Sequence, residues 1–136
     1  MKTGEGSPGN SVTTQGRPRV ILDVHHERGF FFLLLRNIGS EPAVNVVTKF
    51  GPRILGPDGK KEINGIGLFR GVAFFPPGKQ FRVLLGAATA YFSNKQPTKF
   101  PVQVTYSGEN GKAYSEIINH NLEIYRDLPH EAERKG

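Results

Sequence analysis

Glycine and proline divide this chain into short pieces, and their spacing constrains the fold more than any other feature. The 136 residues include 17 glycines and 10 prolines, and both residue types interrupt helices and mark turns. Between them lie short apolar runs, several of which alternate apolar with polar side chains, as half-buried strands do. The pattern predicts an all-β protein, and the chain is long enough to bury a core of its own.

The apolar runs predict seven or eight strands with turn signals between them. The predicted segments are residues 18–25, 29–37, 43–50, a small hairpin over 54–63, 68–75, 79–85, 100–107 and 112–125. A short helical turn is expected around residues 87–91. Many short strands at this spacing are typical of sandwiches. We therefore expect an immunoglobulin-like β-sandwich of seven to eight mostly antiparallel strands.

Both ends of the chain differ in composition from its middle. Residues 1–17 are rich in glycine, serine and threonine, and residues 127–136 are charged, so we expect two flexible tails around one domain at 18–126. The longest apolar run, Phe30 to Leu35, is far shorter than the roughly 20 residues that span a bilayer. The first residues carry no apolar signal-peptide core. We expect a soluble chain without a membrane span.

The loop at Gly108-Glu109-Asn110-Gly111 joins the last two predicted strands, and its length decides their register. A two-residue Asn-Gly loop is the usual choice. A three-residue loop with a glycine bulge instead pairs Tyr106 with Tyr114 and gathers the apolar side chains on one face, so we prefer it. This register also places Glu116 and His120 on that face. Either these two lie near its ends or a bulge rotates them outward.

The strand predicted at 29–37 is apolar on both faces, as in strands that are covered twice. A two-layer sandwich covers only one face. The set that needs another cover is either Phe31, Leu33 and Leu35 or Phe30, Phe32 and Leu34. The glycine-rich segment 51–71 could fold over it, which we favour, or another subunit or domain could cover it. The predicted partner-binding residues are Phe31, Leu33, Leu35, Arg53, Lys60, Lys61, Phe69 and Arg70.

The net charge of +6 and the isoelectric point near 9.8 belong to the folded body, because the charges of the two ends cancel. A basic body can meet nucleic acid, an anionic membrane or an acidic protein. The basic residues are dispersed, which favours ordinary solubility charge. Nucleic-acid binding is the alternative function, with bases stacking on an aromatic platform. That platform would consist of Phe50 and Phe69 beside Lys49, Arg53, Lys60, Lys61 and Arg70.

Catalytic and metal-binding patterns find little support in the sequence. The chain has no cysteine, so disulfides, thiolate zinc sites and cysteine nucleophiles are excluded. It contains no Gly-x-Ser-x-Gly elbow, the usual setting of a serine nucleophile in hydrolases. His25 and Glu27 share a strand face that His120 could approach, but no further ligand is evident. We expect no metal and no cofactor, and an enzyme is the third hypothesis.

Several turn and strand-edge signatures resemble those of bacterial and archaeal immunoglobulin-like modules of the CARDB kind. They are Asn37-Ile38-Gly39, Pro42-Ala43, Val44-Asn45-Val46, Phe75-Pro76-Pro77-Gly78-Lys79, and Val102-Gln103-Val104-Thr105-Tyr106 with Gly111-Lys112. The resemblance covers most of 18–126, although segment 51–71 is longer and richer in glycine than such modules need. It implies an adhesive, spacer or partner-binding unit without catalytic residues. We therefore predict a non-catalytic module for protein interaction, self-association or structural assembly.

Overall fold

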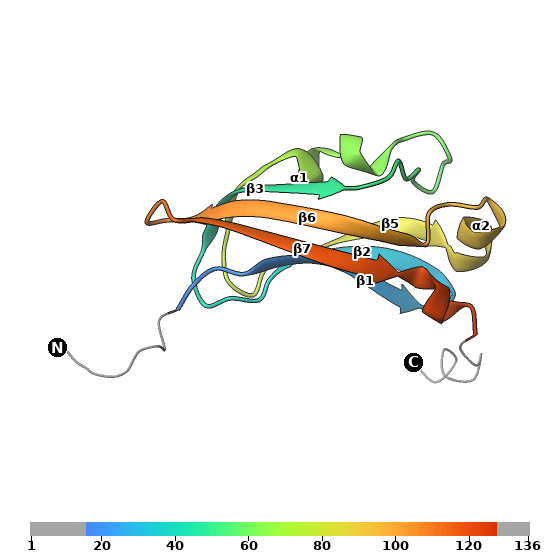
Figure 1. The fold of residues 1–136 in the computed structure, drawn as a ribbon, viewed down its shortest axis with the longest axis horizontal. Coiled ribbons are helices and arrows are strands. Elements are labelled where there is room, and N and C mark those ends of the chain that lie inside the picture. The colour runs from blue at the N-terminus through green and yellow to red at the C-terminus, as the bar shows by residue number, and fades with distance from the viewer. Residues whose placement is uncertain (1–15, 128–136) are drawn as a thin grey trace.

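The computed structural model describes residues 16–127, and the predicted tails lie largely outside them. Within these residues seven strands form two antiparallel sheets (Figure 1). The first sheet has the order β1 (Val20–Glu27), β2 (Phe30–Asn37), β5 (Gln80–Ala87). The second has the order β4 (Val72–Phe75), β3 (Ala43–Phe50), β6 (Lys99–Gly108), β7 (Ala113–Asn121). The all-β prediction is confirmed.

Short helical turns join some of the strands. They are η2 (Ile63–Gly65), α1 (Gly67–Arg70), α2 (Ala88–Ser93) and η3 (Leu122–Tyr125). Helix α2 confirms the turn expected around residues 87–91. The strand predicted at 68–75 is partly wrong, because its first half is helix α1 and only β4 is extended. The small hairpin at 54–63 is reduced to a single bridge between Leu55 and Glu62.

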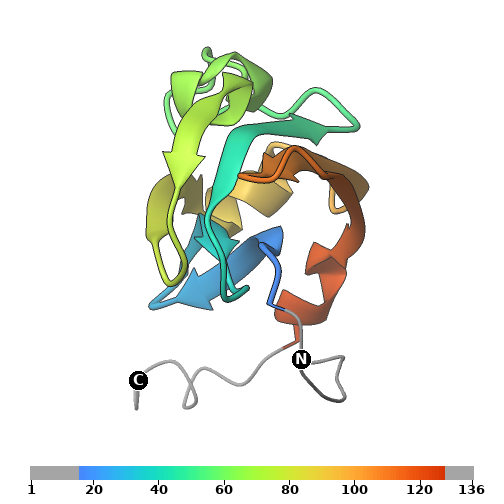
Figure 2. The ribbon, with the colours of Figure 1, turned by 90° about the vertical axis from the view of Figure 1, so that its left-hand side faces the viewer.

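The core lies between the two sheets and follows the alternation of their strands. Val20, Leu22 and Val24 of β1 and every second residue of β6 are buried, and helix α2 adds Tyr91. Segment 51–71 lies beside β3 (green in Figure 2). It adds Ile54, Ile63 and Phe69 to the core. The Phe69 ring meets that of Phe50 edge-on, with centroids 5.1 Å apart.

The β6–β7 hairpin has the predicted bulged register. Tyr106 pairs with Tyr114 and Val102 pairs with Ile118. Gly111 takes the left-handed backbone conformation, with φ of 86°, which a side chain would disfavour. The two tyrosine rings stack with centroids 5.5 Å apart. The apolar pattern of β7 was therefore a sound guide to its pairing.

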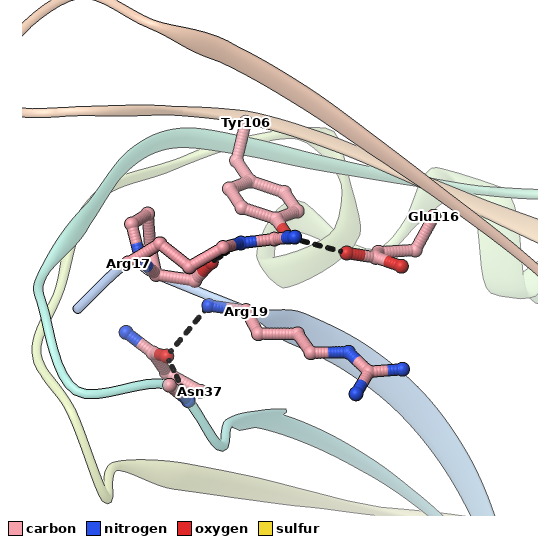
Figure 3. Close-up of polar contacts among 7 residues, drawn as sticks. Arg17, Arg19, Asn37, Tyr106 and Glu116 are labelled. Carbon is pink, nitrogen blue, oxygen red and sulfur yellow. Dashed lines mark hydrogen bonds and ion pairs between the residues drawn. The ribbon is translucent and has the colours of Figure 1, made fainter. Parts of the chain in front are cut away.

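Glu116 and His120 do lie on the inner face of β7, and no bulge rotates them out. The Tyr106 hydroxyl donates to Glu116 Oε2 at 2.7 Å, and Arg17 donates to the same oxygen at 2.9 Å (Figure 3). His120 Nε2 lies 2.9 Å from the carbonyl oxygen of Leu22 in β1. These contacts tie the β1 side of one sheet to β7 of the other. Arg17, the last residue of the predicted tail, therefore contacts both β6 and β7.

Asn37 is a buried polar residue that joins three segments at the C-terminal end of β2. Its side-chain nitrogen donates to the carbonyls of Glu41 at 3.0 Å and Phe75 at 2.9 Å. Its side-chain oxygen accepts from the backbone N–H of Gly39 at 2.9 Å and of Arg19 at 3.3 Å (Figure 3). The amide thereby links the backbone of β4 and of the chain before β1 to the loop that follows β2.

Candidate interaction surface

The outer face of the β1-β2-β5 sheet carries an apolar patch. The even-numbered residues of β2 point outward, and Phe32 is flanked by His25 of β1 and Leu84 of β5. Phe30 is 43% exposed and Leu84 is 41% exposed, while Phe32 is half-buried. We call Phe30, Phe32 and Leu84 the Phe30 patch. Three neighbouring large apolar side chains are therefore in contact with solvent, and exposed apolar patches are a feature of interaction sites.

A network of charged side chains borders the Phe30 patch. Glu27 Oε1 accepts from Arg82 at 3.1 Å and lies 3.1 Å from His25 Nε2. The hydrogen bonds from Arg82 and then from His25 lower the pKa of the Glu27 carboxyl. The Arg82 guanidinium lies over the Phe32 ring, 3.8 Å from its centroid. The carboxylate therefore orients a cation against the aromatic face.

The predicted partner-binding residues of β2 are corrected by the structure. Phe31, Leu33 and Leu35 point inward and are at most 1% exposed. They face the second sheet, whereas the even-numbered residues of β2 point away from it. The alternate set, Phe30, Phe32 and Leu34, forms the outer face, although its neighbours bury Leu34 to 7% exposure. The predicted partner-binding set of β2 therefore belongs to the core.

The same correction applies to Phe69. This side chain is fully buried, and its neighbour Phe50 is 3% exposed. Neither ring can receive a nucleobase while the domain is folded, since stacking needs an open aromatic face. The aromatic platform predicted for nucleic-acid binding is therefore buried and does not lie on the surface.

The four predicted basic residues do lie at the surface, on segment 51–71. Arg53 pairs with Glu62 at 3.1 Å, and Lys60 and Lys61 lie in an exposed turn. Arg70 lines a surface hollow of about 410 Å³ between β3 and α1. Helix α1, which carries Arg70, lies beside β3, whereas the Phe30 patch belongs to the other sheet. The predicted residues therefore do not form one surface.

The cover that we favoured for the outer face of β2 is also corrected. Segment 51–71 buries its apolar residues in the core next to β3. Near the first sheet its Pro57 approaches Gly86, at the end of β5. The Phe30 patch thus has no cover from this segment.

Leu84, Phe74 and Ile117 are exposed apolar residues outside the predicted partner-binding set. Leu84 shares its face with Gln80 and Arg82, and the alternation of residues 79–85 already placed it there. On the outer face of the second sheet Phe74 is 54% exposed and Ile117 is 66% exposed. Both positions follow from the same alternation, which applies to outward as well as inward residues.

The histidines considered as metal ligands are not brought together. His25 lies against Glu27 on the outer face of β1, whereas His120 contacts the Leu22 carbonyl from β7. Among residues 16–127, no group of three histidine, cysteine or acidic side chains could hold a metal ion. None of the helices described in this range is both long and apolar enough to cross a bilayer.

Comparison with known proteins identifies the family of this chain. No curated protein and no solved structure matches it. A family model described as a domain of unknown function, DUF8453, matches residues 10–126, which include all seven strands. The chain therefore belongs to the DUF8453 family.

Proposed function

We propose that this chain is a non-catalytic, immunoglobulin-like module that binds a protein partner through the Phe30 patch. The observation that carries the proposal is the patch itself: neighbouring phenylalanine and leucine side chains that are exposed to solvent on the outer face of the first sheet.

The order of the strands supports the immunoglobulin-like assignment. If the seven strands are read in chain order as A, B, C, C′, E, F and G, the first sheet is A-B-E and the second is C′-C-F-G. Immunoglobulin sandwiches likewise separate A, B and E from C, F and G, and variable-type domains add C′ beside C. The helical crossover α2 then lies between strands E and F.

The chemistry of the patch suits a protein partner. Aromatic residues and arginine are enriched in protein interfaces. Phe32 and Arg82 supply both, and Glu27 holds the arginine in place before any partner arrives. A side chain that is already ordered loses less entropy on binding. The charged groups at the border would select the partner's orientation.

Nucleic-acid binding remains the alternative function. The dependence of affinity on salt distinguishes it from binding to a protein partner. Affinity for nucleic acid falls steeply with salt, because phosphate contacts release counterions. Association through an apolar patch depends much less on salt. Phe50 and Phe69 are buried, so the basic residues of segment 51–71 lack the predicted aromatic platform. This favours binding to a protein over binding to nucleic acid.

The test compares the proteins that this chain contacts in the cell that makes it. The full chain is fused to a proximity-labelling enzyme, and the double variant Phe30→Ser, Leu84→Ser is compared with the wild type. Phe74→Ser is the matched control, because it removes an apolar group that is at least as exposed from the other sheet. We expect at least one abundantly labelled protein to be lost in the double variant and retained in the control.

The complex with that protein should then survive high salt in a pull-down. Identical labelling by the wild type and the double variant would overturn the proposed surface. Loss of all partners at high salt, with nucleic acid recovered at low salt, would favour the alternative function.

A further inference from the structure

Strand β7 forms one long edge of the second sheet. It pairs with β6 over nine residues. The Gly108 N–H donates to the Lys112 carbonyl and the Leu122 N–H donates to the Thr98 carbonyl. Since bonded pairs alternate in an antiparallel ladder, these two bonds show that the even-numbered residues of β7 bond to β6. The backbone groups of the odd-numbered residues therefore point away from the sheet.

Other edges of the two sheets are covered, short or charged. The free edge of β1 meets His120 at the Leu22 carbonyl and Tyr125 at the Val24 carbonyl. The edge of β3 is capped by the side chain of Asn64. Strand β4 is four residues long, and β5 carries Arg82 at its edge. Short length, coverage and charge are the usual ways of preventing strand addition.

The outward side chains of β7 lack these protections. They are Ala113, Ser115, Ile117, Asn119 and Asn121, all exposed. None is charged and none is proline. Ile117 is the most exposed large hydrophobic residue of the described chain, at 66%. An edge that is long, uncharged and apolar at its centre is a template for another strand.

We propose that β7 pairs in antiparallel fashion with β7 of a second copy of this chain, with the two-fold axis through Ile117. This surface is separate from the Phe30 patch, so the inference does not depend on the proposed function. The result is one continuous sheet across the dimer, in which the odd-numbered residues of each strand exchange hydrogen bonds.

The register follows from the strand itself. Ile117 is the midpoint of the nine residues Ala113–Asn121, so an axis there pairs the whole strand. Ile117 then faces its own copy, and Ser115 faces Asn119 of the second copy, with polar pairs outside an apolar centre. A shift of the axis by one residue toward the N-terminus would set Glu116 against Glu116, and like charges directly opposed are unfavourable.

Electrostatics are compatible with this pairing. An inward-pointing charge on an edge strand normally opposes strand addition. Here Glu116 already accepts from Arg17 and Tyr106 within its own chain, so a second strand buries no unpaired charge. Two copies that each carry a net charge of +6 repel one another. Salt screens this repulsion, and we expect association to strengthen as salt is raised.

Disulfide cross-linking tests the register, because the chain has no cysteine. A hydrogen-bonded antiparallel pair has Cα atoms about 5.5 Å apart, within the range of about 4.4–6.8 Å that a disulfide accepts. Ile117→Cys should therefore form a covalent dimer on mild oxidation. Ser115→Cys is the matched control and should cross-link much more slowly, since residue 115 faces residue 119 of the second copy.

The wild-type chain supplies the second readout. In sedimentation at rising concentration we expect a monomer–dimer equilibrium that strengthens with salt. In amide exchange measured by NMR, the odd-numbered residues of β7 should gain protection with concentration, while the even-numbered residues are protected throughout. Ile117→Lys should abolish the dimer. Gln103→Lys, the same change on its cross-strand neighbour in β6, should retain it.

A wild-type monomer at millimolar concentration in moderate salt would overturn the inference, and so would a dimer in which the odd-numbered amides stay unprotected. Protection of those amides only by an added strand of another protein would also overturn it. The variant Phe30→Ser, Leu84→Ser should still dimerise, so failure of this inference and failure of the proposed function give different results.

Discussion

Asn37 is the residue whose removal should reveal most about how this fold is held together. It is 1% exposed, and its side-chain amide makes four hydrogen bonds to backbone groups of three segments. Asn37→Ala removes all four and leaves the Phe75 carbonyl buried without this partner. The variant should fold, but with a much lower free energy of unfolding.

The size of the loss follows from the geometry. Three of the bonds are 2.9–3.0 Å long, and each is worth about 1 kcal/mol net. The fourth bond, 3.3 Å long from the Arg19 N–H, adds up to about 1 kcal/mol more. The sum is about 4 kcal/mol, a large part of the roughly 5–15 kcal/mol that stabilises an ordinary domain. At about 4 °C per kcal/mol for a domain of this size, the melting temperature should fall by roughly 15 °C.

Urea unfolding followed by circular dichroism measures this change directly. Asn94→Ala is the matched control, because Asn94 is exposed at the end of α2 and should change the stability by less than about 0.5 kcal/mol. A loss below about 1 kcal/mol for Asn37→Ala would refute the reasoning. It would mean that water or rearranged backbone replaces the four bonds.

Three further changes follow from individual contacts. Thr48 Oγ1 is buried with no hydrogen-bond partner among the described residues, so Thr48→Val should raise the free energy of unfolding by about 1 kcal/mol in urea titrations; a loss would show that the hydroxyl has a partner. Phe31→Ala should cost about 3–5 kcal/mol, whereas Phe30→Ala on the outer face should cost far less, and equal losses would contradict the assigned faces of β2. The pKa of Glu27 is lowered mainly by Arg82, so its ionised form stabilises the fold above the ordinary carboxyl pKa and this contribution disappears as the pH falls through the lowered pKa. Glu27→Gln should flatten the acid side of a stability–pH curve measured in low salt, and an unchanged curve would contradict this role.

Where the apolar residues of a strand clearly fall on one face, the sequence predicts the structure well. Strand β3 has the predicted bounds, 43–50. The β6–β7 register could be predicted because only one slip gathers Tyr106, Tyr114 and Ile118 on one face. Glycine at 111 then supplies the backbone conformation that this loop requires.

The inward face of β2 could not be predicted from its own residues, because Phe30–Leu35 is apolar at every position. The turn before it does contain the information. Arg28 and Gly29 both have positive φ, as two-residue hairpins of the mirror-image type require. Glu27 therefore faces Phe30, and the polar row of β1 faces the even-numbered residues of β2. The outward set follows from that pairing.

Helix α1 was missed for a different reason. Ile63 in η2 and Phe69 in α1 turn toward the core from two separate short helices, and Ile66 between them is extended. The glycines between them indicated loop and strand instead. A run this short has too few apolar positions to separate a helical from an extended period.

Cysteine footprinting of the Phe30 patch tests the central claim most directly. Phe30→Cys gives the chain a single thiol on the patch, and Ser93→Cys gives one at an exposed site on α2. In the purified protein both thiols should react rapidly with a maleimide. In the cell that makes the protein, at its natural level, the account predicts that the thiol at position 30 is protected while the thiol at position 93 is not. Equal labelling of both positions in the cell would contradict a partner on this face.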